Sequence, residues 1–310
     1  MNKKEFRTLD EQIDILKSKD LIINNVDVAK DILLRENYFF INGYRYLFFD
    51  KNKKRKFITG TKFEELYSAF LFDRNVRNIM FKNLLVVENN IKSIISYQLS
   101  KKYGFKEKDY LNPKNFIQDY KDSRRVDDVL NKMKRQIRVN GEKHTATYHY
   151  INKYQYVPLW ILVKVLSFGL INELYGILKP EDKEEIASFY KISSEELKVY
   201  LQLLSNYRNL CAHEDIVYDH RTQTFINDTK YHDLLNIEKN ELGEYIQGKN
   251  DLFSVIIIFK QMLDKERFEE LIREIKICFD KFDQGVQIIS NEKLLTRMGF
   301  PKNYMDIIDL

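Results

Sequence analysis

The chain has 310 residues, 44% of them hydrophobic, and a formal net charge of +5 at pH 7. This length permits a large buried core and is long for one domain. Only 10 Gly and 4 Pro occur, which argues against a turn-rich all-β protein and favours an all-α one. The mild basic excess permits a polyanionic partner without requiring one.

The pattern of cysteines and histidines argues against several kinds of site. Cys211 and Cys278 form no CxxC pair, and the five histidines lack zinc-finger spacing. We expect no metal site, no disulfide scaffold and, without a Gly-rich phosphate loop, no nucleotide cofactor. The polar N-terminus shows no signal peptide, and the apolar segment 157–178 contains charged residues that argue against a membrane span. We therefore expect a cytoplasmic protein.

Helical signals begin near the N-terminus. Thr8 and Glu11 have the spacing of a capping box, and a second short helix is expected over 26–36. The segment 38–49 is rich in aromatic residues and is interpreted as a short helix and a turn. Its aromatic side chains, like Trp160, are interpreted as core residues more readily than as base-stacking ones.

Two basic segments are candidate RNA-binding surfaces. The first is the run 51–56, which includes Lys53, Lys54, Arg55 and Lys56. It is either a solvated loop or a loop that contacts phosphates. The second lies in an exposed helix expected within 106–143 that ends in a loop near Gly141, and its basic residues include Lys132, Lys134, Arg135 and Arg138.

The strongest helical pattern covers 63–103, and its length predicts one long helix or two helices with a kink between them. Apolar residues recur there at helical steps on one arc, namely Met80, Leu84, Val87, Ile91, Ile94 and Ile95. Arg77 and Glu88 also fall inside this arc, where an ionisable side chain is costly unless it is paired or functional. Glu88 could orient a catalytic residue, pair with Arg77 or Arg208, or form an ion pair with Lys92 at the edge of the arc.

The second half of the chain predicts five further helices. An apolar helix is expected over 159–178, where Pro180 stops it, and a short one over 181–190. Ser193 caps the next helix, which runs toward Arg208. A final pair covers 252–263 and 268–282 and precedes a short tail. We divide the chain into an N-terminal helical extension (1–60), a helical core (61–242) and a C-terminal helical segment (243–310).

Arg208 and His213 are the candidate catalytic residues. Arginine offers a permanent cation with a planar fork that suits phosphate, and histidine exchanges a proton near neutral pH. Together they suit RNA cleavage by the neighbouring 2′-hydroxyl, in which a base takes the proton and a cation stabilises the added negative charge. The two residues lie about 140° apart on a regular helix, so they converge only if the helix ends or bends between them.

Spacing alone does not distinguish this pair. Random placement gives roughly 0.7 Arg–His matches over three spacings, and Arg138 with His144 also matches. The alternative for Arg208 and His213 is a pair of cations stabilised at a helix C-terminus. Cys211, which lies between them, is interpreted as a buried packing residue and not as a nucleophile.

Four stretches of the sequence carry a family resemblance over most of the chain. They are Asn42-Gly43-Tyr44; Asp73 to Arg77 with Val87 to Lys92; Pro158-Leu159-Trp160 with Ser167-Phe168-Gly169; and Leu204 to His213. In this order they resemble the Abi-like family of bacterial abortive-infection proteins, the AbiD/AbiF group. The last stretch is similar to the Arg-Asn-x-x-x-His signature of HEPN ribonucleases.

This resemblance implies a HEPN-type helical bundle with additional N-terminal and C-terminal helices. It implies a toxin that acts in phage defence as a metal-independent endoribonuclease. Its active site is then composite and forms across a homodimer. Residue by residue, Arg208 and His213 are then catalytic, Asn209 positions them, and Glu88 matches an acidic residue of an earlier helix. Asp215 stands where some such toxins carry a tyrosine that a partner enzyme modifies, so control by that modification is not implied. A small noncoding RNA is the partner that the AbiF group implies instead.

Two other functions remain open from the sequence. In a non-catalytic RNA-binding protein, Arg208 would clamp a phosphate, and the basic segments, together with Arg77, would supply the affinity. In a protein–protein adaptor, the apolar helices would bind a protein and no RNA would be retained.

Overall fold

The structure is a computed structural model, and it describes residues 5–310. The protein is all-α, as predicted: 67% of it is helical, and the described residues contain isolated β-bridges but no strand. The first elements in chain order are α1 (Leu9–Lys17), α2 (Val26–Glu36), α3 (Tyr38–Gly43), α4 (Arg45–Phe48), α5 (Phe63–Tyr103), α6 (Glu107–Tyr110), η1 (Pro113–Asn115), η2 (Tyr120–Asp122), α7 (Ser123–Asn140) and α8 (Thr145–Tyr154). The remaining ones are α9 (Leu159–Leu162), η3 (Val163–Val165), α10 (Phe168–Ile177), α11 (Pro180–Ser188), α12 (Ser194–Ala212), α13 (Lys230–Leu234), α14 (Leu252–Met262), α15 (Lys265–Gly285), α16 (Asn291–Met298) and η4 (Tyr304–Ile308).

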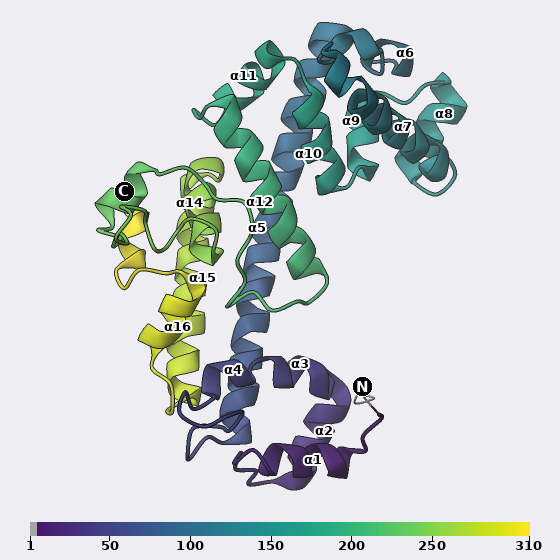
Figure 1. The fold of residues 1–310 in the computed structure, drawn as a ribbon. Helices are drawn as coiled ribbons and strands as arrows, with labels where there is room; N and C mark the ends of the chain where they lie inside the picture. The colour runs from purple at the N-terminus through teal and green to yellow at the C-terminus, as the bar shows by residue number, and fades with distance from the viewer. Residues whose placement is uncertain (1–4) are drawn as a thin grey trace.

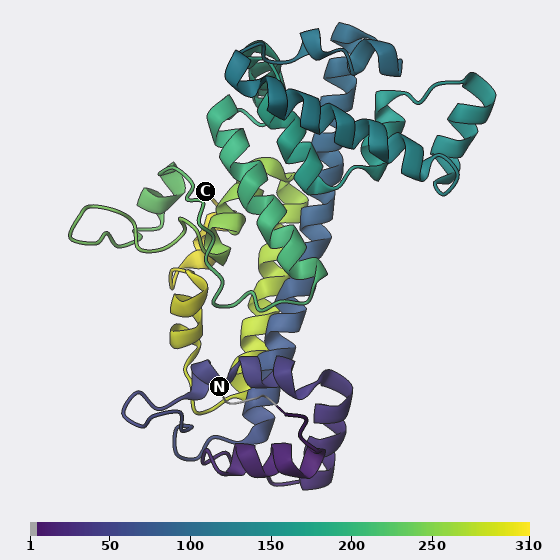
Figure 2. The same cartoon turned by 45° about the vertical axis from the view of Figure 1, so that its right-hand side comes forward.

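Helix α5 is the axis of the molecule. Its 41 residues span about 60 Å at 1.5 Å per residue. Helices α1 to α4 gather at its N-terminal end and α6 to α9 at its C-terminal end (Figure 1). Helices α12 and α15 both pack along it, as the turned view also shows (Figure 2). The apolar arc predicted from sequence is buried in this packing, except for Ile94, which is partly buried.

Local capping signals place several helices where the sequence predicts them. Helix α2 has the predicted bounds, and Thr8 forms a complete capping box at the start of α1. At the start of α12, the Ser193 hydroxyl accepts from the Glu196 amide at 3.2 Å, and the Glu196 carboxylate accepts from the Ser193 amide at 2.9 Å. The beginning of the helix that carries Arg208 is therefore fixed by its own sequence.

The apolar segment 159–178 corrects the prediction of one continuous helix. It breaks into α9, η3 and α10, because Leu166 is extended and Ser167 starts a new helix by accepting from the Leu170 amide at 3.2 Å. Pro180 ends this segment and also occupies the first turn of α11. Proline is tolerated there, because an N–H at this position would have no partner within the helix. The C-terminal tail forms two further short helices, α16 and η4.

The aromatic residues are divided between core and surface, which corrects the prediction that they are core. Tyr44 and Phe48 are buried, whereas Phe39 is 74% and Tyr46 57% exposed. Trp160 is 42% exposed. Short helices at 38–43 and 45–48 produce this division, because each can bury only one face.

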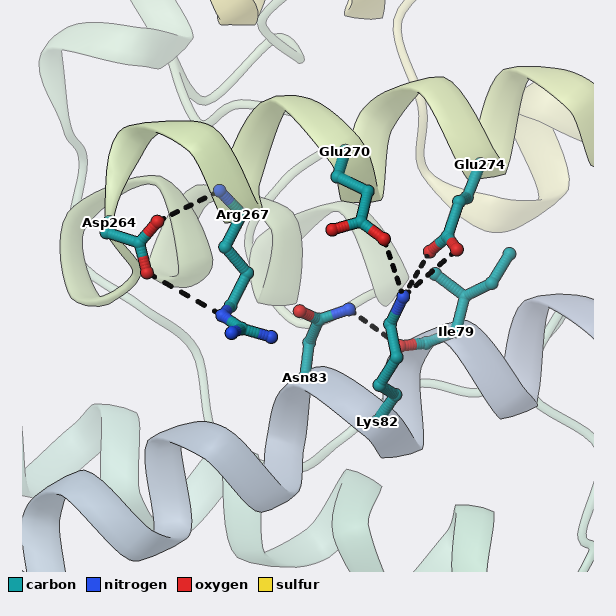
Figure 3. Close-up of polar contacts among 7 residues, drawn as sticks. All are labelled: Ile79, Lys82, Asn83, Asp264, Arg267, Glu270 and Glu274. Carbon is teal, nitrogen blue, oxygen red and sulfur yellow. Dashed lines mark hydrogen bonds and ion pairs between the residues drawn. The ribbon is translucent and has the colours of Figure 1, made fainter.

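Helix α15 joins the C-terminal segment to the central helix. Lys82 of α5 reaches Glu270 at 3.2 Å and Glu274 at 2.9 Å on α15 (Figure 3). Phe72 packs between the rings of Phe279 and Phe282. No helix in residues 5–310 combines the length and hydropathy that a membrane crossing requires.

Candidate active site between helices α5 and α12

A buried glutamate on α5 holds the candidate catalytic arginine on α12. Arg208 Nε donates to Glu88 Oε2 at 3.2 Å, and Lys92 Nζ lies 2.7 Å from Glu88 Oε1. Glu88 is only 4% exposed. Of the pairings that the sequence left open for Glu88, the structure therefore forms those with Arg208 and Lys92, but not the one with Arg77.

The rest of the Arg208 guanidinium is available to a ligand. Its side chain is 28% exposed and lies 5.9 Å from the centre of the Phe81 ring. In the described part of the chain, its two terminal nitrogens have no hydrogen-bond partner. A guanidinium fixed through Nε in this way presents a planar pair of N–H groups to an incoming phosphate.

His213 lies where α12 ends. The helix stops at Ala212, and the His213 amide donates to the Asn209 carbonyl at 3.0 Å. Glu214 follows in the left-handed region at φ 58°, and the amide of Asp215 donates to the Leu210 carbonyl at 3.0 Å. This is the pattern of a Schellman motif. His213 is thus the C-cap residue of α12, and its amide still makes the last helical hydrogen bond.

Both His213 and Asn209 are exposed to solvent. Cys211 is buried between them, as predicted, and burial raises the pKa of its thiol to about 12. A thiol with this pKa is protonated at neutral pH and is a poor nucleophile. Among residues 5–310, no three His, Cys, Asp or Glu side chains are grouped to hold a metal ion.

A second buried carboxylate, Asp73, fixes the loop that follows His213. It is fully buried and accepts from the Tyr44 hydroxyl at 2.7 Å, from Arg77 Nη1 at 2.8 Å, and from the amides of Val217 at 3.2 Å and Tyr218 at 2.8 Å. Burial raises the pKa of this carboxyl, and the donors oppose the rise. We call Asp73 and these four donors the Asp73 cluster.

The Asp73 cluster corrects one prediction and adds residues that sequence reasoning missed. Arg77 is 3% exposed, and its guanidinium also donates to the Asp215 carbonyl at 3.2 Å. It is therefore not a surface contact for RNA. Asp73 and Tyr44 were not candidates, although both lie within the stretches that carry the family resemblance. A further signal for Asp73 was its helical position, which falls on the same apolar arc as Arg77 and Glu88.

The structure separates the two predicted basic segments. Lys53, Lys54 and Arg55 are exposed in the loop before α5, whereas Lys56 is held by the Ser18 carbonyl at 2.7 Å and by Asp20 at 2.9 Å. Arg135 and Arg138 are exposed on α7, near the opposite end of α5 (Figure 1). Lys132 of α7 is paired with Asp128 and Glu173 at 2.8 Å each.

The fold and this site define the protein as all-α, with a buried glutamate of a long central helix that holds an arginine five residues before an exposed histidine at a helix end. The chain belongs to the Abi-like protein family, whose model matches residues 31–219. This membership suggests a role in abortive infection, a form of phage defence. The match includes Asp73, Glu88, Arg208 and His213. Comparisons with curated proteins and with solved structures gave no match.

Proposed function

We propose that this chain is an endoribonuclease that acts in phage defence, with Arg208 and His213 as its catalytic residues. One observation supports this proposal above the others. A buried carboxylate holds Arg208 by Nε alone, which leaves two cationic N–H groups free beside the helix end that exposes His213. An arginine that only stabilised the helix end would not need a buried anion to fix its direction.

The proposed reaction is transfer of an RNA phosphodiester to the neighbouring 2′-hydroxyl. His213 takes the 2′ proton, the 2′ oxygen bonds to phosphorus, and the bond from phosphorus to the 5′ oxygen breaks. The leaving oxygen takes up a proton, so the products are a 2′,3′-cyclic phosphate and a 5′-hydroxyl. Arg208 stabilises the negative charge that accumulates on the phosphate oxygens, and Asn209 positions Arg208 and His213.

A homodimer completes this proposed site. One histidine can act as the base, and a second group must protonate the leaving oxygen in the same step. His213 of a second copy supplies that acid when the two helix ends meet across a two-fold axis. Glu88 serves as a positioning residue, because it contacts Arg208 and not the RNA. A small noncoding RNA that binds the exposed cations of loop 51–56 and of α7 is the proposed means of control.

The proposal is tested by analysing the ends of RNA incubated with purified protein. We expect wild-type protein to generate 2′,3′-cyclic phosphates and 5′-hydroxyls, and Arg208→Ala and His213→Ala to generate neither. His149→Ala on α8 and Arg273→Ala on α15 are matched controls, because both residues are exposed and lie outside the site. RNA that wild-type protein binds but does not cut would support the non-catalytic RNA-binding function instead.

A further inference from the structure

A cavity lies directly beside the helix end that carries His213. Its volume is about 410 Å³, and it is formed by α3, α4 and the loop that follows α12. This volume falls within the range of roughly 300–1,000 Å³ that small-molecule sites occupy. The residues that matter for its chemistry are Phe39, Phe40, Arg45, Tyr46, Glu214 and Asp215. We call it the aromatic pocket.

Three aromatic side chains of this pocket are exposed, whereas Tyr44, Phe70 and Tyr218, which also line it, are buried. Phe39 is 74%, Phe40 40% and Tyr46 57% exposed, and the two phenylalanine rings lie 6.0 Å apart in an edge-to-face arrangement. Arg45 lies over the Tyr46 ring at 4.3 Å and donates to the Asn42 carbonyl at 2.7 Å. Exposed rings beside a fixed guanidinium are the side chains on which unpaired RNA bases stack.

Three carboxylates line the pocket, and two of them, Glu214 and Asp215, supply hydrogen-bond acceptors, since Asp219 is paired with Arg297. Glu214 and Asp215 directly follow His213, and both are exposed. The Schellman motif and the Asp73 cluster hold their backbone in place. A carboxylate accepts two hydrogen bonds side by side, and among the RNA bases guanine presents two adjacent N–H donors on its Watson–Crick edge. The pocket chemistry therefore favours guanine.

Cations from three separate segments, around Lys19, within 45–55 and on α16, lie at the end of the molecule that contains the aromatic pocket. Lys293 of α16 donates to the Leu47 carbonyl at 2.9 Å, and the Phe57 amide donates to the Lys19 carbonyl at 2.9 Å, so these segments lie together. Burial, and then repulsion from Arg45 and Arg55, lower the pKa of Lys19.

The same crowding of like charges is seen on α16. Burial lowers the pKa of Lys293, and repulsion from Arg297 and Lys51 lowers it further. Such a cluster of positive charges suits a polyanion, because a polyanion neutralises several of them at once.

We propose that the aromatic pocket binds one unstacked guanine of a single-stranded RNA, and that the surrounding cations bind the phosphates of that strand. The inference rests on the proposed function, since it makes the pocket a subsite beside Arg208 and His213. The base would stack against Phe39 and Tyr46, and its Watson–Crick edge would meet Glu214 or Asp215. RNA held in this way passes directly beside the catalytic pair.

The experiment measures binding of labelled single-stranded RNA by fluorescence anisotropy, on His213→Ala protein so that no strand is cut. One oligomer contains a single guanine in a run of uridines, and its match has adenine at that position. We expect Phe39→Ala and Tyr46→Ala each to weaken binding of the guanine oligomer about tenfold. Tyr148→Ala on α8 is the matched control, because Tyr148 is 52% exposed and lies outside the pocket.

A second variant tests base recognition independently of stacking. We expect protein with both Glu214→Gln and Asp215→Asn to lose the preference for guanine over adenine, while its affinity for the adenine oligomer does not fall. Equal affinity for the two oligomers in the His213→Ala background, or unchanged binding by both aromatic variants, would overturn the proposal. So would a change from dimer to monomer in the aromatic variants by light scattering without a change in RNA affinity, since the pocket would then be an interface.

The two proposals can fail separately. Wild-type protein that binds guanine in the pocket but leaves no cyclic phosphate ends would support the pocket and overturn the nuclease. Cleavage that requires His213 but proceeds with unchanged KM and sequence preference in Phe39→Ala and Tyr46→Ala would support the nuclease and overturn the pocket.

Discussion

Two of the three buried carboxylates on helix α5, Asp73 and Glu88, differ in how their partners are arranged. Asp73 is fully buried, and its four donors are buried with it or belong to the backbone. Glu88 is 4% exposed, but its partner Arg208 has a side chain that is 28% exposed and two free terminal nitrogens in the described structure. The first arrangement is complete within the protein. The second leaves an oriented guanidinium whose terminal nitrogens can bind a ligand.

The difference indicates separate roles for two buried charges on one helix. A buried charge with all its hydrogen bonds satisfied stabilises one arrangement of the chain, here the loop after His213. A buried charge that fixes a half-exposed cation instead orients that cation for a ligand. We therefore propose that the Asp73 cluster stabilises the fold and that Glu88 orients Arg208 in the candidate site. The following changes test this division, from the largest expected effect to the smallest.

Replacing Asp73 should affect stability most. Asp73→Ala leaves Arg77 buried without its carboxylate and removes the acceptor for the amides of Val217 and Tyr218. We expect the free energy of unfolding to fall by about 3–5 kcal/mol, measured by urea denaturation. Asp73→Asn keeps an acceptor and should lose less. A loss below about 1 kcal/mol for Asp73→Ala would show that the cluster is not a structural anchor.

Replacing Glu88 should affect catalysis more than folding. Glu88→Gln retains an oxygen that accepts from Arg208 but removes the charge that fixes the guanidinium. We expect kcat for RNA cleavage to fall about 10-fold to 100-fold, with little change in KM, because the positioning is needed in the transition state. Glu270→Gln on α15 is the control, since Glu270 pairs with Lys82 away from the site. Equal cleavage rates for Glu88→Gln and Glu270→Gln protein would show that Glu88 does not position the catalytic arginine.

Gly43 couples the two regions, because a Cβ at this position would lie 2.7 Å from Ile216 Cδ1. Because the nearest atom is the end of a flexible side chain, we expect Gly43→Ala to lower the free energy of unfolding by no more than about 1 kcal/mol, measured by urea denaturation. Gly169→Ala is the matched control, because a Cβ at position 169 would lie 3.7 Å from Ser205 Oγ, which is an ordinary van der Waals distance. Combining Gly43→Ala with Ile216→Val should restore part of the lost stability.

Replacing His213 should affect stability least. The side chain is exposed and has no partner among the described residues. We expect His213→Ala to change the free energy of unfolding by no more than about 0.5 kcal/mol by urea denaturation. A loss of 2 kcal/mol, on the order of a removed buried hydrogen bond, would instead assign His213 to the fold.

Local signals made much of the fold predictable. The apolar arc of 63–103 and the caps at Thr8 and Ser193 act over a few residues, and the structure confirms them. The break at Ser167 was missed because apolar residues on both sides continue the helical pattern, while one serine hydroxyl starts a new helix. Helix breaks inside a uniformly apolar run leave only this weak signal.

The candidate site was predictable only in part. Arg208, His213 and Glu88 stood out, but whether Glu88 reaches Arg208 depends on how α5 and α12 pack. The Asp73 cluster was missed because two of its donors are backbone amides, which no side-chain pattern reveals. Asp73 with Arg77 also has the i, i+4 spacing of an ordinary surface ion pair.

The most direct test of the central claim is the single-turnover rate of RNA cleavage by Arg208→Ala and His213→Ala protein, compared with wild type. Both variants should first be shown to melt within a few degrees of wild type. The account predicts that each loses at least about 100-fold in rate while remaining folded. Folded variants that cleave RNA at half the wild-type rate or faster would contradict it, because the charge held by Glu88 would then have no part in the chemistry.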